Sequence, residues 1–331
     1  MSLFSPDDLN AAFPEATPDA LQDPSAATYE AMAEAFVASE EAAGRLALTG
    51  GHHDAIGDLM AEPEASLGDV LSTPEASTPF QELTAASAER TLALYRLAGG
   101  ANSDEETRPL LVEGFQNADW EKLEASYRAY EALGLQPEVV MSLEGQPLSY
   151  WQNLFSQLRQ WQDTHVDDPV HKLKYQTDGD GLYVNEEVAN NWDSLVETDK
   201  PRWTISVVPG TPKPQVVSID RDGKNSEGEV PQELIDILAA QDPQSGQKVL
   251  THPSIESYLT MQALRLKNGQ DPVDSQTWSW LAGKFMQGTG NNQQQAAPGG
   301  FWYPGSGRVG LLWDRVGRRG DFLGVRPAVR G

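Results

Sequence analysis

The residues best suited to chemistry lie in the stretch 299–331, where aromatic and arginine side chains interrupt an apolar strand pattern. From Val309 to Trp313 the odd positions are apolar, which predicts the buried face of a strand. The even positions then point the other way. Aromatic and arginine side chains are frequent anchors at binding surfaces, so the chemistry predicted here is noncovalent recognition.

A second apolar run, 323–329, follows an arginine-rich loop at 315–322. The run predicts another strand, and Pro327 indicates an edge or a bulge in it, because proline cannot donate to a strand ladder. Alternate residues of such a pair can vary on one face without disturbing the packed face.

Cysteine and histidine chemistry has little support in this chain. There is no cysteine, which excludes disulfides, thiolate metal sites and cysteine nucleophiles. The adjacent His52 and His53 lie at a Gly-rich helix end and are interpreted as a solvated turn. His165 and His171 stand six residues apart near Asp167 and Asp168, a weak ligand-like cluster. The sequence therefore predicts no metal site, no cofactor and no catalytic residue.

Two turns are rich in oxygen donors but lack the spacing of an EF-hand loop. Their acidic and amide residues are Asp178, Asp180, Asp220, Asp222, Asn225, Glu227 and Glu229. Calcium binding stays open on this pattern. The chain also lacks a Walker loop, a dinucleotide fingerprint and a Gly-x-Ser-x-Gly elbow.

Length and net charge limit the classes of partner that this chain can bind. The chain has 331 residues, 39% of them hydrophobic, and a net charge of −25, which makes nucleic acid an unsuitable partner. The charge is uneven. Residues 1–150 carry 27 acidic and 6 basic residues, 151–200 carry 10 and 4, and 201–331 carry 12 and 14, so the net charges are −21, −6 and +2.

No secretory signal and no apolar stretch of about 20 residues is visible, so no membrane span is predicted. The default localisation is cytoplasmic, and a phage-associated or surface-associated protein remains possible. The oligomeric state stays open.

The first half of the chain reads as a helical domain over residues 1–165. Apolar positions at helical spacing predict helices after Asp23-Pro24, from Phe80 to Leu97, after Ser103, from Trp120 to Gly134, and around Trp151 to Trp161. Residues 54–78, rich in Glu, Ala, Ser, Pro and Gly, predict a mobile acidic loop.

The second domain, 166–331, mixes strands and helices in an α+β arrangement. Strands are predicted at Trp203–Val208, at Gln215–Ile219 and in the two terminal runs, and a Trp-containing segment lies at Thr277–Leu281. Helices are predicted at Pro231–Ala240 and Pro253–Lys267, and a polar loop at Gly288–Gly300.

The terminal block has the form GGxWxPGxGxVxLxWxxVGxRGDxLGVRPAVR. With the preceding strand pair, two helices and Trp segment, it resembles the C-type-lectin fold. More narrowly, it resembles the variable (target) proteins of diversity-generating retroelements, whose lectin-like domain is related to formylglycine-generating enzymes. The resemblance covers roughly residues 200–331, and the helical half lies outside it.

In that family, hypervariation of codons near the 3′ end of the gene alters a ligand-binding surface on a fixed scaffold. The resemblance implies a scaffold of Trp302, Pro304, Val309, Leu311, Trp313, Val316, Gly324, Val325 and Arg326. It implies these ligand-binding, variable positions: Tyr303, Gly305, Ser306, Gly310, Leu312, Asp314, Arg315, Arg318 and Phe322.

The sequence therefore favours a non-enzymatic variable protein that binds an unknown protein or small-molecule ligand. Because the chain has no cysteine, formylglycine-generating chemistry is excluded. Two alternatives stay open: a metal-dependent enzyme on the same fold, and an adhesin or structural component of a phage or cell surface.

Overall fold

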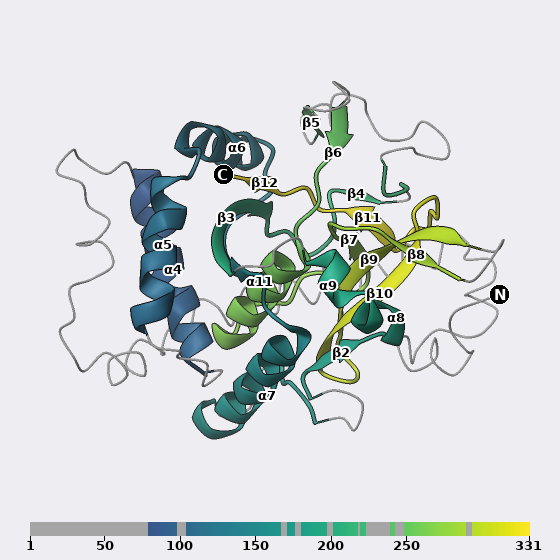
Figure 1. Cartoon of the computed structure of the whole chain (residues 1–331), viewed down its shortest axis with the longest axis horizontal. Coiled ribbons are helices and arrows are strands. Elements are labelled where there is room, and N and C mark those ends of the chain that lie inside the picture. The colour runs from purple at the N-terminus through teal and green to yellow at the C-terminus, as the bar shows by residue number, and fades with distance from the viewer. Residues whose placement is uncertain are drawn as a thin grey trace. The chain divides into compact units, whose positions relative to one another are not determined.

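The computed structural model of the chain describes residues 79–97, 104–166, 171–175, 180–196, 201–217, 219–222, 239–241, 248–288 and 293–331. The predictions for 1–78, which include the first helix, the acidic loop 54–78 and the His52-His53 pair, lie outside these residues. The described residues combine helices with antiparallel and mixed sheets (Figure 1), which confirms the α+β class.

Five of the seven described helices lie where apolar periodicity predicted a helix, and the short α8 (Glu186–Asn190) and α9 (Trp192–Leu195) were not predicted. The other five are α4 (Pro79–Leu97), α5 (Asp104–Gln116), α6 (Trp120–Ala132), α7 (Leu148–His165) and α11 (Ile255–Lys267). Short polar side chains cap several of them, as helix starts require. Asp119 accepts a hydrogen bond from Lys122 N at 3.1 Å, and Ser254 accepts one from Ser257 N at 3.0 Å.

The strands form two main sheets and a small hairpin. They are β1 (Pro137–Glu144), β2 (Leu182–Val184), β3 (Arg202–Pro209), β4 (Val216–Val217), β5 (Ala239–Gln241), β6 (Lys248–Leu250), β7 (Trp278–Trp280), β8 (Phe285–Gln287), β9 (Gln294–Tyr303), β10 (Arg308–Arg315), β11 (Leu323–Val325) and β12 (Val329–Arg330). The first sheet has the order β1-β3-β12. The second has the order β2-β10-β9-β7-β11-β4, with β8 also paired to β9.

The first sheet joins segments from both sides of the predicted boundary at residue 165. β1 lies in the half predicted to be all helical, yet it pairs antiparallel with β3 along its whole length, from Pro137↔Pro209 to Glu144↔Arg202. The boundary between compact units falls between Ser66 and Leu67. Helices α4 to α7 therefore belong to the same unit as the C-terminal strands.

Residues 294–303 correct a second prediction. The predicted polar loop Gly288–Gly300 contains most of β9, which pairs with β10, β7 and β8. Gly300 is needed there for packing rather than for a turn, because a Cβ on it would overlap the ring of Tyr258 in α11. The predicted helix Pro231–Ala240 falls mostly outside the described residues, and its last residues, Ala239 and Ala240, lie in β5 instead.

The sequence predicts a single strand for the terminal apolar run, but the structure divides it into two. β11 pairs with β7 and β4 in the second sheet, whereas β12 pairs with β3 in the first. The residues between them, Arg326 to Ala328, are buried, and Pro327 stands where the chain crosses from one sheet to the other. The predicted edge or bulge is thus a crossing between sheets.

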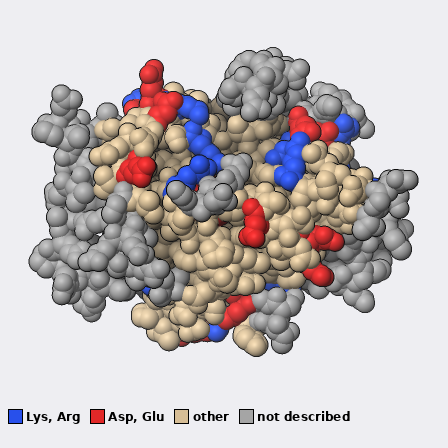
Figure 2. Space-filling view, viewed as in Figure 1, with Lys and Arg blue, Asp and Glu red and all other residues tan. Residues whose placement is uncertain are grey.

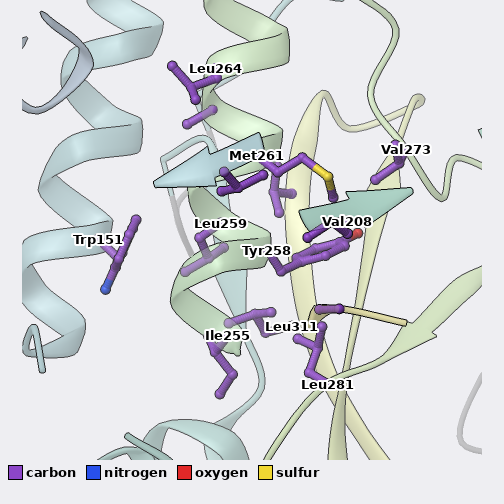
Figure 3. Packing of buried hydrophobic residues seen from close by; sticks show 14 of the residues in the cluster. Trp151, Val208, Ile255, Tyr258, Leu259, Met261, Leu264, Val273, Leu281 and Leu311 are labelled. Atoms are coloured by element: carbon purple, nitrogen blue, oxygen red, sulfur yellow. The ribbon is translucent and has the colours of Figure 1, made fainter. Parts of the chain in front are cut away.

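Helix α11 is the centre of the core. Almost every residue from Ile255 to Leu266 is buried, because β1, α4, α7 and β9 contact the helix from different directions. Tyr258 points from α11 toward the strands, and Trp151 of α7 lies on the opposite side of the helix (Figure 3). This helix connects the two sheets through a single apolar cluster.

A buried ion pair joins the sheet crossing to the rest of the second sheet. Arg326 and Asp274 are both fully buried, and their Nη2 and Oδ1 atoms lie 2.8 Å apart. Asp274 also accepts a hydrogen bond from Ser279 Oγ at 2.7 Å, and Arg326 donates to the carbonyl of Thr211 at 2.9 Å. All the charged atoms of this pair therefore have partners, as burial of charge requires.

A second buried polar group lies at the start of α11. Glu256 is 3% exposed, and its Oε1 accepts a hydrogen bond from Gln146 N at 2.9 Å. Burial, with a further contribution from the nearby Glu144, raises the pKa of Glu256 to about 8, and the charge of Arg330 opposes the rise. Glu144 itself is paired with Arg202 at 3.3 Å.

Candidate recognition face

The residues predicted to bind a ligand surround the hairpin formed by β9 and β10. Cross-strand partners share a face of a sheet, and the register pairs Arg308 with Tyr303, Gly310 with Phe301 and Leu312 with Gly299. The alternate residues, such as Val309 and Leu311, face the core. We call the face that carries Phe301, Tyr303, Arg308, Gly310 and Leu312 the recognition face.

Four rings form a continuous row on this face, which we call the aromatic strip: Tyr303, Phe301, Trp278 and Phe322. Tyr303 meets Phe301 edge-on at 4.1 Å between ring centroids, and Phe301 stacks on Trp278 at 5.2 Å. Trp278 then meets Phe322 edge-on at 5.4 Å. Phe301 is buried within the row, whereas the other three rings are half-buried, so the strip presents its edges to the surface.

A guanidinium group lies at each end of the aromatic strip. Arg308 is 4.6 Å from the ring centre of Tyr183 in β2 and 5.9 Å from that of Tyr303. At the other end, Arg318 is 5.7 Å from the ring centre of Phe322. Such cation–π contacts hold a guanidinium in place.

The turn and the loop place most of the predicted ligand-binding residues near the strip. Tyr303 and Leu312 are half-buried on the recognition face, and Gly305 and Ser306 lie in the turn between β9 and β10. Segment 171–175 holds that turn, because Lys174 Nζ donates to the carbonyl of Gly305 at 2.9 Å. The turn is therefore part of a fixed frame.

The loop after β10 is braced by charge. Arg315 is exposed at the end of β10, and Arg318 and the half-buried Phe322 lie in the loop beyond it. Arg318 Nη1 is 3.0 Å from Oδ2 of Asp314, and Arg319 is 3.6 Å from Asp220. These ion pairs tie the loop 315–322 to β10 and to segment 219–222.

Two residues of the predicted set do not face the surface. Asp314 is 3% exposed, and its carboxylate accepts a hydrogen bond from Arg315 N at 2.8 Å. Burial raises the pKa of Asp314, and the Arg315 N–H and the Arg318 charge oppose that rise. Gly310 is also buried, because the Phe301 ring covers it. The expectation that these two positions point freely outward is wrong, since neighbouring side chains fill the space.

Substitution of Gly310 tests this packing. A Cβ at position 310 would overlap the Phe301 ring, so Gly310→Ala is expected to lower the free energy of unfolding by about 1–3 kcal/mol, the usual cost of overpacking. Urea unfolding measures the loss, and near-ultraviolet circular dichroism reports the displaced rings.

Gly317→Ala is the matched control, because no atom lies within 4 Å of a Cβ built at that position. It should leave the unfolding midpoint almost unchanged. A Gly310→Ala protein as stable as the parent, with the same aromatic spectrum, would show that Phe301 does not depend on the glycine.

The four residues that sequence reasoning missed are Tyr183, Trp278, Phe301 and Arg308. Arg308 lies one residue before the predicted alternating run, and nothing in the sequence identified its aromatic partners. Tyr183 reaches the site through parallel pairing of β2 with β10, where it stands opposite Gly310. That pairing joins segments more than 100 residues apart.

Positive and negative side chains are mixed on the surface. In Figure 2, charged residues of both signs lie next to each other over the upper part of the view, and a broad middle area carries few charges. On the face in view, the charges are therefore not spread evenly.

Asp167 and Asp168 of the predicted His165–His171 cluster lie outside the described residues, and the two histidines have different partners. His165 stacks on Trp161 within α7 at 5.5 Å, whereas Nε2 of His171 is 2.5 Å from Oδ1 of Asp271. Asp222 is paired with Lys284 at 2.9 Å. Within the described ranges, no three His, Asp or Glu side chains gather in a way that could hold a metal ion.

Comparison with family models, with curated proteins and with solved structures finds no match to this chain. In the part of the chain that the structure describes, no helix has both the length and the apolar character needed to cross a membrane.

Proposed function

We propose that this chain is a non-enzymatic recognition protein whose C-terminal lectin-like domain displays a variable ligand-binding surface, as in the target proteins of diversity-generating retroelements. Binding would rest on complementarity of aromatic and arginine side chains, with no bond made or broken. The helices α4 to α7 would support that domain, because they pack into the same core.

The observation that carries the proposal is the difference in burial between the two faces of the β9–β10 hairpin. Val309 and Leu311 are fully buried against the core, whereas Tyr303 and Leu312 are half-buried on the opposite face. A frame of this kind tolerates exchange of the outward residues while keeping its shape.

The packing narrows the set of positions that can vary freely. Six of the predicted residues are at least partly accessible: Tyr303, Gly305, Ser306, Leu312, Arg315 and Phe322. Arg318 is partly accessible but braces the buried Asp314. We therefore expect codon 310 to keep a small residue and codon 314 to keep an acidic one.

Sequencing this locus in many cells of the source population tests the proposal. Adenine-directed substitutions at codons 303, 306, 312, 315 and 322, beside a near-copy of the segment that serves as template, would support it. Uniform codons at these positions, with no repeat and no neighbouring reverse transcriptase, would contradict it. Codons for the core residues Val309 and Leu311 serve as the internal control, since they should be constant in either case.

A further inference from the structure

We propose that the recognition face binds an acidic peptide segment of a partner protein. Apolar side chains of that segment would contact the aromatic strip, and its carboxylates would pair with Arg308 and Arg318 at the two ends. This inference rests on the proposed function and names the ligand class of the same surface.

The first support is the continuity of the strip. Each ring contacts the next at 4.1–5.4 Å between centroids, and Phe301, in the middle, is covered by its neighbours. Rings that hold one another in this way lose little conformational entropy on binding, which favours affinity. The strip therefore offers a rigid apolar surface.

The second support is the position of the two arginines. Arg308 lies against two tyrosine rings that come from different strands, so its guanidinium is held at one end of the strip. Arg318 lies against Phe322 at the other end and contacts Asp314 through Nη1. A guanidinium has five N–H donors, so the single contact with Asp314 leaves Arg318 able to bind a carboxylate.

The third support is charge complementarity. Residues 301–331 contain six arginines and two aspartates, although the whole chain carries −25. Asp314 is buried in its pair with Arg318 and Arg326 is buried in its pair with Asp274, so neither adds much to the field outside, and Arg308, Arg315 and Arg318 are the arginines at the recognition face. Opposite charge speeds encounter and rejects wrong partners, and here it selects an acidic ligand.

The chemistry of the face favours a peptide over other acidic ligands. Nucleic acid would be repelled by the rest of the chain. A saccharide needs many polar groups around the rings, whereas Gly299, Gly310 and Leu312 lie along the strip and the polar Arg308 and Arg318 lie at its ends. An extended peptide advances about 3.3 Å per residue, so a segment of roughly four to six residues could follow the row of rings.

Selection from a displayed random peptide library, with the full-length chain as bait, tests the inference. The peptides enriched by the parent chain should contain aromatic or aliphatic residues with an excess of Asp and Glu of about twofold or more over the starting library. Arg308→Gln and Arg318→Gln should each weaken binding of an enriched peptide about tenfold, the effect expected on loss of one charge-assisted contact.

Two variants make the result specific. Arg128→Gln changes an arginine on α6, which contacts β1, β3 and β12 rather than the recognition face, and it should not alter binding. Arg308→Lys keeps the charge but loses the planar group, and it should weaken binding less than Arg308→Gln. Urea midpoints confirm that each variant is folded, so that Arg308→Gln decides the question if loss of Arg318 destabilises the loop.

The outcomes separate this inference from the proposed function. Enriched peptides that lack an acidic excess, and that still depend on Tyr303, would overturn the inference and leave the proposed function standing. Binding of alginate, a carboxylated polysaccharide, with dependence on Arg308 and without any enriched peptide would overturn the peptide assignment. Peptides that bind independently of Tyr303 and Arg308 would count against both proposals.

Discussion

Arg326→Met is expected to lower the free energy of unfolding by about 3–5 kcal/mol, the usual cost of removing one partner from a buried ion pair. Both members of the pair are fully buried, and the substitution leaves the Asp274 carboxylate with hydrogen bonds from Ser279 and Thr277 but without its counter-charge. The loss should appear in urea unfolding monitored by tryptophan fluorescence.

Two further proteins assign the loss to the pair. Arg128→Met is the control, because Arg128 forms an exposed ion pair with Glu124 on α6, and such pairs contribute little. The double variant Arg326→Met with Asp274→Asn should be less destabilised than the sum of the single changes, because no charge is then left buried. Additive losses would show that the two residues act separately.

Glu256→Gln is expected to raise the free energy of unfolding above neutral pH and to change it less in acid. The folded protein holds the pKa of Glu256 at about 8, against 4.5 for an ordinary glutamate. The unfolded chain therefore ionises first, and the stability that the protonated group contributes is complete below pH 4.5 and is lost as pH rises to about 8. The shift corresponds to about 5 kcal/mol.

Urea unfolding of both proteins between pH 4 and pH 9 measures this effect. The difference in free energy between variant and parent should grow across pH 4.5–8 and then remain constant. Glu131→Gln, at an exposed position of α6, is the matched control for loss of one carboxylate. A difference that does not change with pH would contradict the assignment of the titration to Glu256.

His252 affects the free energy of unfolding on the acid side of the same pH range. Burial, with repulsion from Arg221, lowers the pKa of this imidazole to about 3, so the folded protein keeps it neutral. Its contribution is complete above pH 6.5 and is lost as pH falls toward 3. Between pH 4.5 and 6.5 the two groups change stability in opposite directions, so we expect a plateau there in the parent protein.

The helices were predictable because their signals are local. Apolar spacing and capping residues lie within a few turns, and the ends of α4, α6 and α11 lie at or within two residues of the predicted positions, whereas α7 extends beyond its predicted stripe at both ends. β1 was missed because its apolar run, Val139 to Leu143, is short and stands between helices, where periodicity cannot separate a strand from a buried helix segment. Its pairing with β3 joins segments that are far apart in the sequence, so local patterns do not reveal it. The domain boundary depends on this pairing and is hidden from local patterns for the same reason.

For the candidate site, too, only the local features were predictable from the sequence. Alternation along β10 assigned the two faces correctly, because side-chain direction in a strand is a local property. Burial of Gly310 and Asp314 was not predictable, since it depends on Phe301 across the hairpin and on Arg318 in the loop. The partnership of Tyr183 with Arg308 likewise arises only when β2 pairs with β10.

The position of β12 affects the order in which the chain can fold. β3 is the middle strand of its sheet, and its second neighbour is made of residues 329–330, far along the chain. Lys122 in α6 also donates to the carbonyl of Arg330, across 208 residues. Closing such long loops is slow. During synthesis, one edge of β3 therefore stays open until residues 329–330 emerge from the ribosome, and chains interrupted before that point would present an unpaired strand edge to one another.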